Sequence, residues 1–599
     1  MLASVLFRVV YQLKVLYQLR AHHPRPRGGG QGSARRNAGL PGLVPVVVYS
    51  PLYSTTGFGS IWRMCLRPVL CALLVAVFGV APAWAKPCPA ANSAVNPTPA
   101  VNGWGFGVRN HRFIAESQAG ITQENIDGLA LQWVFALPDT TAPRFLPLVT
   151  EDSVLITDTP GIVYALDRDT GCEKWRFDVG SAVRTTLTYI PRGDAHLVVL
   201  GTFDGEMLAL DLLTGEAVWR FDADDHPRAM LSGSPVYHAG VIYQPVSSWE
   251  VMWAANPFYS CCTFRGSVLA VSAATGEILW RTYTIDREPE VVIERFLLPD
   301  HIGPSGAPVW SQPTLDLDRG LLYVGTGENY SAPPTDTSDA ILALDMETGD
   351  IVWQRQFTSG DAWNLSCEVA LDINCPPDHG EDLDFGAPPI LARAGQQEMI
   401  LAGQKSGRVY GLDPERTGEP VWSARLGAGG KVGGVHFAMA VDTARGVLYV
   451  PVSDRSIGDA EHEPNPSLHA LDILTGESLW ETAAPGDCVE RPPGEEPRPI
   501  DECFPGFSAA PTATENLVFA PTLDGFLRAF DADDGAELWA FDTRGMHPAV
   551  NGGEALGGAF DLGGVMLDRG QLFVASGYGQ FGQLPGNAFM VFAVDSSKR

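Results

Sequence analysis

Hydrophobic and polar positions alternate in a motif that recurs seven times along the chain. Each copy begins with a short apolar run, passes through an acidic or small polar residue into a turn that contains glycine, and ends in tryptophan. The copies occupy residues 163–175, 207–219, 268–280, 341–353, 409–422, 468–480 and 527–539. Alternation on both sides of a tight turn predicts a β-hairpin in each copy, with the tryptophan on its second strand.

The spacing of the motif predicts a β-propeller. Successive tryptophans lie 44, 61, 73, 69, 58 and 59 residues apart, which fits four-stranded blades with loops of varying length. Residues 131–133 hold a tryptophan without its hairpin, and residues 589–595 hold a strand and an aspartate without the tryptophan. Joined, these two ends complete one more blade and hide its edges. We therefore predict an all-β, eight-bladed propeller with tryptophan-docking repeats, closed by N- and C-terminal strands in one blade; seven blades are the alternative.

Composition and charge exclude some classes of function. The chain has 599 residues, of which 45% are hydrophobic and 19% charged, a globular composition. Basic residues number 41 and acidic residues 70, for a net charge of −29. A protein that binds a phosphate backbone needs a basic face, so we expect no nucleic-acid partner.

The N-terminal region has the features of an export signal. Residues 1–85 hold nine basic and no acidic residues, so residues 86–599 carry 32 basic against 70 acidic side chains. Residues 64–85 combine a short charged start, an apolar stretch too short for a stable membrane span, and an A-x-A site at 83–85. We predict a cleaved signal peptide there and a periplasmic location; a buried helix or a retained anchor is the alternative. Residues 1–63 are predicted to be a disordered start-site extension, and 86–599 a single propeller domain.

Eight cysteines follow the predicted cleavage site, and an even number in an exported chain indicates disulfides. Cys367 with Cys375 and Cys488 with Cys503 are the natural local pairs. Cys88 and Cys172, and the neighbours Cys261 and Cys262, would then remain, although spacing alone leaves the connectivity open. The chain has no C-x-x-C-H sequence, so we expect no covalently attached haem.

The motifs together resemble the pyrroloquinoline quinone (PQQ) dehydrogenases, and most of all the polyvinyl alcohol dehydrogenases. The repeats are similar to the tryptophan-docking motifs of that family, and the more specific loop segments are residues 102–113, 261–268, 303–310, 325–331, 361–364, 403–407 and 576–589. The resemblance covers residues 100–595. It implies oxidation of an alcohol by PQQ and Ca²⁺, with an aspartate as base.

The resemblance also implies the base and the calcium ligands. Asp361, in the segment GDAW, is similar to the catalytic aspartate of methanol dehydrogenases and is a candidate metal ligand as well. Glu250 in SSWE and Glu328 in GTGE stand where that family has calcium ligands, with Asn329 beside the second. Carboxylate and amide oxygens are suitable for Ca²⁺. For each residue the alternative is an ordinary turn or loop position.

The expected PQQ contacts follow in the same way. Trp310 resembles the tryptophan on which the quinone lies, and Lys405 the cation at its oxygens. Further candidates are hydroxyls, a second cation and the adjacent cysteines, namely Ser232, Ser247, Ser248, Arg184, Cys261 and Cys262. In methanol-type enzymes a ring formed by two adjacent cysteines lies over PQQ. His436 lies in a region that the family places near the cofactor.

We therefore predict a periplasmic quinoprotein that oxidises secondary or polymeric alcohols and passes electrons to a separate cytochrome c. The alternative is a non-catalytic scaffold in the cell envelope, similar to the outer-membrane assembly factors that share the blade repeat. A relative that keeps the fold but has lost PQQ is the third possibility. The sequence leaves the alcohol, the oligomeric state and the electron acceptor open.

Overall fold

Eight antiparallel sheets of four or five strands dominate the computed structural model, which describes residues 86–90, 93–455, 463–490 and 498–595. The predicted extension and signal peptide (1–63 and 64–85) lie outside the described residues. The first four sheets are β2–β5 (Leu148–Val149, Ser153–Thr157, Ile162–Asp167, Glu173–Asp178), β6–β9 (Thr188–Arg192, Ala195–Gly201, Glu206–Asp211, Ala217–Asp222), β10–β14 (Ala229–Met230, Val236–His238, Val241–Ser248, Ser267–Ser272, Ile278–Tyr283), and β18, β19, β21 and β22 (Thr314–Asp316, Leu321–Gly325, Ala340–Asp345, Ile351–Gln356).

The other four sheets complete the ring of blades. They are β23–β26 (Ile390–Ala394, Gln397–Gly403, Arg408–Asp413, Glu419–Arg425), β27–β30 (Ala440–Asp442, Val447–Val452, Ser467–Asp472, Ser478–Ala483), β33–β36 (Thr512–Ala513, Leu517–Phe519, Phe526–Asp531, Glu537–Asp542), and β1 with β39–β41 (Leu129–Ala136, Met566–Asp568, Gln571–Ser576, Ala588–Val594). The prediction of an eight-bladed, all-β propeller is confirmed.

Short elements lie outside the eight sheets. They are the pairs β15–β16 (Glu290–Ile293, His301–Gly303), β17–β20 (Ser305–Gly306, Asn329–Ser331), β31–β32 (Val489–Glu490, Arg498–Pro499) and β37–β38 (Gly545–Pro548, Glu554–Gly557), with helices α3 (Glu116–Ala119) and α4 (Glu250–Trp253) and the 3-10 turns η3 (Ile126–Gly128), η4 (Leu365–Glu368) and η5 (Pro414–Arg416). Within the described residues, no helix is long and apolar enough to cross a bilayer.

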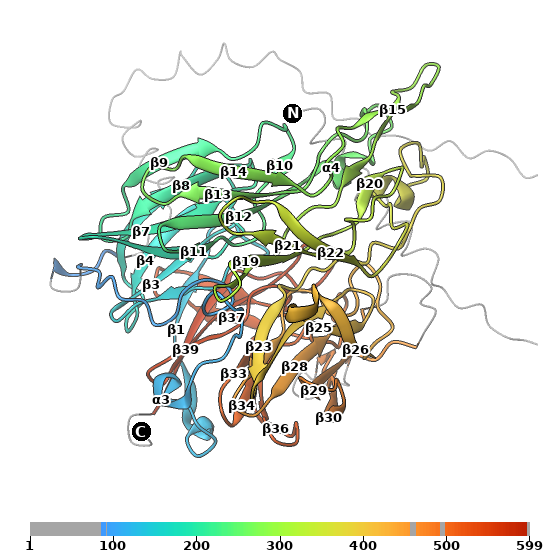
Figure 1. Ribbon diagram of the computed structural model, residues 1–599. Helices are drawn as coiled ribbons and strands as arrows, with labels where there is room; N and C mark the ends of the chain where they lie inside the picture. The colour runs from blue at the N-terminus through green and yellow to red at the C-terminus, as the bar shows by residue number, and fades with distance from the viewer. Residues whose placement is uncertain (1–85, 91–92, 456–462, 491–497, 596–599) are drawn as a thin grey trace, which may run out of the picture. The chain divides into compact units, whose positions relative to one another are not determined.

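The two ends of the described chain meet in one blade, as the sequence predicted. Strand β1 pairs antiparallel with β41 from Leu129 opposite Val594 to Ala136 opposite Ala588. In Figure 1 the blue β1 lies beside the red C-terminal strands, near the label β39. Because this pairing covers the outer edge of β41 with a strand from the other end of the chain, it closes the ring of sheets.

Each repeated motif forms the last two strands of a blade, and its tryptophan docks on the next blade. In the β8–β9 turn, the Asp211 carboxylate accepts the N–H groups of Leu213 and Thr214, both at 2.9 Å. The Trp175 ring of the preceding blade lies against Gly215 in that turn, and its Nε1 donates to the Leu212 carbonyl at 3.1 Å. A Cβ at Gly215 would lie 2.5 Å from the Trp175 ring, and Gly215 has a φ of 75°. The glycine is therefore required both by the turn and by the ring against it.

The same contact runs through the other blades. A tryptophan lies against the turn glycine of the following blade in Trp133–Gly171, Trp219–Gly276, Trp280–Gly349, Trp353–Gly418, Trp422–Gly476 and Trp480–Gly535. The last motif tryptophan, Trp539, meets Phe592 of the closing strand β41 edge to face, with ring centroids 6.0 Å apart. Buried side chains of neighbouring sheets also share cores, such as Leu155 and Val163 with Val198 and Leu208.

We predict that Gly215→Ala lowers the stability of the fold by about 2 kcal/mol, because the methyl group both strains a left-handed turn and meets the Trp175 ring. The matched control is Gly193→Ala, which has a φ of 58° and nothing within 4 Å of a new Cβ. Urea unfolding followed by tryptophan fluorescence measures both. An equal loss in the two variants would show that docking adds nothing beyond the backbone cost.

Candidate active site

A cluster of buried carboxylates lies where loops of two neighbouring blades meet. Glu328 follows β19, while Asp382 and Asp384 lie in the loop that leads into β23. These three residues are 4–7% exposed, and each offers a carboxylate oxygen within 4.8 Å of the others. Together they form the acidic cluster of this protein.

Lys405, from the turn between β24 and β25, neutralises part of the acidic cluster. Its Nζ donates to Asp382 Oδ1 at 2.6 Å and to Asp384 Oδ2 at 2.9 Å. The same Nζ lies 5.7 Å from the centre of the Trp310 ring, and Trp310 Nε1 donates to Asp384 Oδ2 at 3.1 Å. The predicted contact residues Trp310 and Lys405 are thus brought together, with Asp384 bonded to both.

Burial and mutual repulsion set the protonation of the cluster. Burial, together with the negative charges of Asp384 and Asp382, raises the pKa of Glu328 well above its ordinary value. Burial alone would also raise the pKa of Asp384, but the Lys405 ammonium and a hydrogen bond with the Glu328 carboxyl lower it. Burial and the neighbouring acids therefore favour the protonated form of Glu328, whereas Lys405 favours the ionised form of Asp384.

Asp361 supports the segment that carries the cluster. Its Oδ1 accepts the Asp382 N–H at 3.2 Å and its Oδ2 accepts the Leu383 N–H at 2.9 Å. Burial raises the pKa of Asp361, and these two N–H groups act in the opposite direction. The side chain predicted as the base therefore lies beside the cluster, with each oxygen already bonded to the backbone.

Trp310 forms an aromatic platform beside the cluster. A Cβ on Gly386 would lie 2.1 Å from Trp310 Cη2, so the backbone of Gly386 supports the ring directly. His436 and Phe437 meet the ring edge to face at 6.0 and 6.1 Å. Burial, with Lys405 and Arg184 nearby, holds the pKa of His436 well below its ordinary value, so this imidazole is neutral.

Arg184 lies over the same platform. Its guanidinium carbon is 5.7 Å from the centres of both the Trp310 and the Phe437 rings. Its buried Nε has no hydrogen-bond partner among the described residues. Arg184, Ser232 and Trp310 line one cavity, so three of the predicted cofactor contacts share a single site. A partly buried guanidinium with an unpartnered Nε is suited to an anionic ligand.

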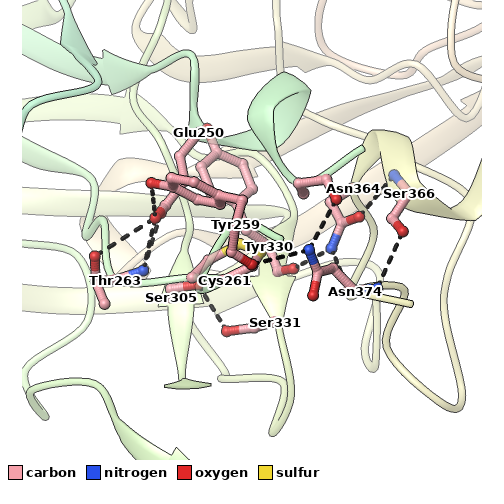
Figure 2. Close-up of a disulfide and its surroundings, with 12 residues drawn as sticks. Glu250, Tyr259, Cys261, Thr263, Ser305, Tyr330, Ser331, Asn364, Ser366 and Asn374 are labelled. Atoms are coloured by element: carbon pink, nitrogen blue, oxygen red, sulfur yellow. Dashed lines mark hydrogen bonds between the residues drawn. A yellow bond between two sulfur atoms is a disulfide. The ribbon is translucent and has the colours of Figure 1, made fainter. Parts of the chain in front are cut away.

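Glu250 lies in a separate hydrogen-bonding environment. The carboxylate accepts the Thr263 N–H at 2.9 Å, the Phe264 N–H at 2.8 Å and the Tyr259 hydroxyl at 2.9 Å (Figure 2). Both Glu250 and Glu328 act on the buried Tyr330, whose pKa is raised first by burial and then by these charges. The two predicted metal ligands are therefore within electrostatic range of one group, but Glu250 is not part of the acidic cluster.

Asn329 and the predicted serines make structural bonds. The Asn329 amide donates to the Ser305 carbonyl at 3.1 Å and accepts the Thr335 N–H at 2.7 Å. Ser232 and Ser247 bond to each other at 2.6 Å, and the Ser248 hydroxyl donates to the Arg228 carbonyl at 2.7 Å.

Four disulfides hold the connecting segments, and all four are pairs that the sequence indicated. They join Cys88 to Cys172, Cys261 to Cys262, Cys367 to Cys375, and Cys488 to Cys503. The adjacent pair is buried, and Figure 2 shows Cys261 near Tyr330 and Ser331. The strand that contains Ser331 begins one residue after Glu328, so this disulfide lies near the segment that carries one of the cluster acids.

Asp382 and Asp384 are the residues that sequence reasoning missed. Their signal was the pair of acids separated by one residue in the segment EDLDFG, directly before a blade. Two like charges at such a spacing, in a loop and not in the repeated turn, are a candidate metal or acid–base site. The segment that contains Cys367 and Cys375 separates Asp382 and Asp384 from Asp361. The motif GDAW therefore pointed to Asp361 alone.

Comparison with known proteins agrees with this geometry. Residues 103–426 match the family described as "Glucose/ethanol/alcohol dehydrogenase, beta-propeller domain", and residues 405–560 match that of the outer membrane protein assembly factor BamB. A solved quinohemoprotein alcohol dehydrogenase, ADHIIG of Pseudomonas putida HK5, shares the fold with a TM-score of 0.60 at 19% identity, covering 83% of this chain and 80% of its own. The chain belongs to the PQQ-dependent alcohol dehydrogenase family.

Two relatives are similar over most of their length. A polyvinylalcohol dehydrogenase of Pseudomonas sp. is 36% identical over 512 residues, which cover 82% of this chain and 77% of the relative. A polyvinylalcohol dehydrogenase of Sphingopyxis sp. (strain 113P3) is 35% identical over 511 residues, covering 82% of this chain and 76% of the relative. The resemblance stated from the sequence is thereby confirmed.

A further buried acid lies within electrostatic range of Arg184. Asp561 accepts hydrogen bonds from the Ser508 hydroxyl and the Gln583 amide, and burial raises its pKa to about 6. The folded protein thus keeps a proton on Asp561 that the unfolded chain, with an ordinary value of 3.8, releases earlier. The contribution of Asp561 to stability therefore falls as the pH rises from about 4 to about 6.

We predict that Asp561→Asn removes this pH dependence. The stability of the variant relative to the natural protein should rise by about 3 kcal/mol at most between pH 4 and pH 7, because Asn has no proton to lose. Equilibrium unfolding of both proteins at several pH values measures the difference. A difference that is constant over this range would contradict the prediction.

Proposed function

We propose that this protein oxidises secondary or polymeric alcohols with PQQ and Ca²⁺ and passes the electrons to a separate cytochrome c in the periplasm. The observation that carries the proposal is the buried Lys405, which bonds to two carboxylates and lies over an aromatic platform. Such an arrangement places a cation, acids and a flat apolar surface at one point, as oxidation of a hydroxyl group requires.

The residues at the platform fit a flat, anionic cofactor. Trp310 offers its ring, Arg184 has an unpartnered Nε, and the buried Ser311 Oγ and His436 Nδ1 have no partner among the described residues. Aromatic faces and unpaired donors of this kind are suited to the rings and carboxylates of PQQ. When bound, PQQ would accept the hydride of the alcohol.

The acidic cluster fits a hard divalent cation. Glu328, Asp382 and Asp384 present oxygens close together, and Lys405 offsets the negative charge of Asp382 and Asp384 only in part. Oxygen-only ligands of this type are those that Ca²⁺ takes, and the ion would polarise the reacting oxygen. Glu250 lies outside the acidic cluster, and the Asn329 side chain bonds to Ser305 and Thr335, so we assign these two expected ligands to shaping the walls of the site.

We assign separate roles to two aspartates, one as the base and one as the residue that positions it. Asp382 bonds to the cation that lies over Trp310, so we propose that its carboxylate takes the hydroxyl proton. Asp361 holds the N–H groups of Asp382 and Leu383 and so fixes the loop on which Asp382 lies. Asp361, predicted as the base from the sequence, remains the alternative for that role.

The remaining parts of the proposal have electrostatic and chemical support. Residues 86–599 carry 70 acidic against 32 basic side chains, a charge that attracts a basic cytochrome. Four disulfides are compatible with an oxidising compartment such as the periplasm, as is the signal-like segment 64–85.

Reconstitution tests the proposal and the division of roles. With PQQ and Ca²⁺ added, the protein should oxidise polyvinyl alcohol and short secondary alcohols in a dye-linked assay. Asp382→Asn should lower kcat by about a thousandfold or more while still binding PQQ, as measured by its absorbance, because the base is lost. Asp361→Asn should lower kcat less.

A matched control is Asp442→Asn, a buried aspartate that accepts the N–H groups of Ala444 and Arg445 in another blade. It should keep natural activity. If Asp361→Asn abolishes turnover and Asp382→Asn does not, Asp361 is the base. If the natural protein neither binds PQQ nor oxidises an alcohol, the scaffold function is favoured instead.

Calcium titration tests the metal site separately. Glu328→Gln should weaken Ca²⁺ binding by about tenfold or more in calorimetry, because one charged oxygen ligand is lost while the hydrogen bond to Asp384 is kept. Asp442→Asn should bind Ca²⁺ as the natural protein does. If Glu250→Gln weakens Ca²⁺ binding by the same factor, Glu250 is a calcium ligand as well.

A further inference from the structure

An apolar hairpin extends from the blades on the segment between β14 and β17. All four residues of β15 are exposed, with Val291 52%, Val292 41% and Ile293 44% exposed. Phe296 and Leu297, in the connection from β15 to β16, are 90% and 86% exposed. Figure 1 shows this hairpin, labelled β15, projecting from its neighbours. We call residues 290–303 the apolar hairpin.

A cavity of about 240 Å³ lies at the base of the apolar hairpin. Val292 and Ile293 line it together with Cys261 and three prolines, and Ser331 and Asn374 supply polar groups. A volume of this size admits several carbon atoms of a chain. The lining has no acidic, lysine or arginine side chain, and burial lowers the pKa of its one histidine, His301, to about 4, so the wall is uncharged at neutral pH.

One polar atom in this wall is left without a partner. The Asn374 Nδ2 group donates to the carbonyls of Ala254, Asn256 and Tyr259, at 3.0, 3.1 and 3.2 Å, which fixes the orientation of the amide. The Asn374 Oδ1 atom is buried and accepts no hydrogen bond within the described part of the chain. A buried acceptor in an apolar, uncharged wall is suited to a ligand that brings a hydroxyl donor.

The cavity is continuous with the segments that build the candidate active site. Ile302 of β16 exchanges backbone hydrogen bonds with the adjacent cysteines, from Cys262 N–H at 3.0 Å and to the Cys261 carbonyl at 2.9 Å. Ser331, which also lines the cavity, ends the strand that begins directly after Glu328. Figure 2 shows Cys261, Ser331 and Asn374 in one neighbourhood.

We propose that the apolar hairpin and the cavity at its base bind a long aliphatic chain that carries spaced hydroxyl groups, and so position a polymeric alcohol for oxidation. This inference rests on the proposed function and names the surface that selects its substrate. The exposed apolar side chains cover the methylene groups, and Asn374 Oδ1 accepts a hydroxyl. Glu288, Glu290, Glu294 and Asp300 on or beside the hairpin outnumber Arg287 and Arg295 in the same segment, so its net negative charge disfavours an anionic chain.

The test compares a polymer with a short analogue of the same chemistry. The full chain, loaded with PQQ and Ca²⁺, is assayed on polyvinyl alcohol and on 2,4-pentanediol. The variant Phe296→Ser/Leu297→Asn removes the apolar tip, and Asn is chosen because Leu297 has a φ of 69°. The ratio of kcat/KM for the polymer to that for the diol should fall about tenfold, because contacts far along the chain are lost.

A second variant and a control keep the test decisive. Ile293→Thr, which keeps a β-branched side chain in the cavity wall, should shift the ratio in the same direction. Leu479→Ser, an equally apolar residue that is 54% exposed on β30, should leave the ratio at its natural value. Polymer binding without turnover, followed by intrinsic fluorescence of the chain, should weaken in the hairpin variants alone.

The outcomes separate the inference from the proposed function. An unchanged ratio and unchanged polymer binding in both hairpin variants would overturn the inference, while alcohol oxidation by the natural protein would still stand. Failure of the natural protein to oxidise either alcohol would overturn the proposed function, whatever the polymer binding. Self-association in ultracentrifugation that the hairpin variant abolishes would assign the hairpin to a second copy of the chain and overturn the inference as well.

Discussion

The contact between a tryptophan and the turn glycine of the next blade is the constraint on which the rest of this structure depends. Each blade alone has two apolar faces and cannot bury them. A flat ring placed on a backbone without a side chain lets neighbouring blades approach closely and in one orientation. Because the contact is repeated around the ring, small deviations in the orientation of one blade do not accumulate. Strand β1 therefore meets β41 in register.

The site depends on that regularity. Glu328, Asp382 and Lys405 come from three separate loops on two adjacent blades, and none of these loops contains a repeat residue. Buried carboxylates repel one another strongly, so they can be held together only if the blades cannot move apart. The Lys405 ammonium offsets part of this repulsion, and Asp361 ties the acidic loop down through two backbone N–H groups. The rigid scaffold thus holds together buried carboxylates whose mutual repulsion is unfavourable.

Local motifs locate some of the acidic residues of the site and not others. Glu328 was found because its segment, GTGE, resembles a known motif, and the structure places it in the acidic cluster. Asp361 was found in the same way and lies next to the cluster, bonded to its backbone. Asp382 and Asp384 were missed because a segment of about twenty residues, as counted along the chain, separates them from the recognised motif. A motif records only a local spacing, whereas the fold brings residues together across such a segment.

The architecture and the family can be read from local patterns in the sequence. The alternating strands, the turn glycines and the tryptophans predict eight blades, because each of these signals is local and is repeated. Lys405 and Trp310 were also found from the sequence, but their meeting with Asp384 was not. The tertiary structure is needed to show which acids lie together. It also shows that backbone N–H groups bond to the Glu250 carboxylate, and that the apolar hairpin lies at the cavity lined by Cys261. These are contacts between loops far apart in the chain, and no local pattern encodes the distance between two such loops once the blades have closed.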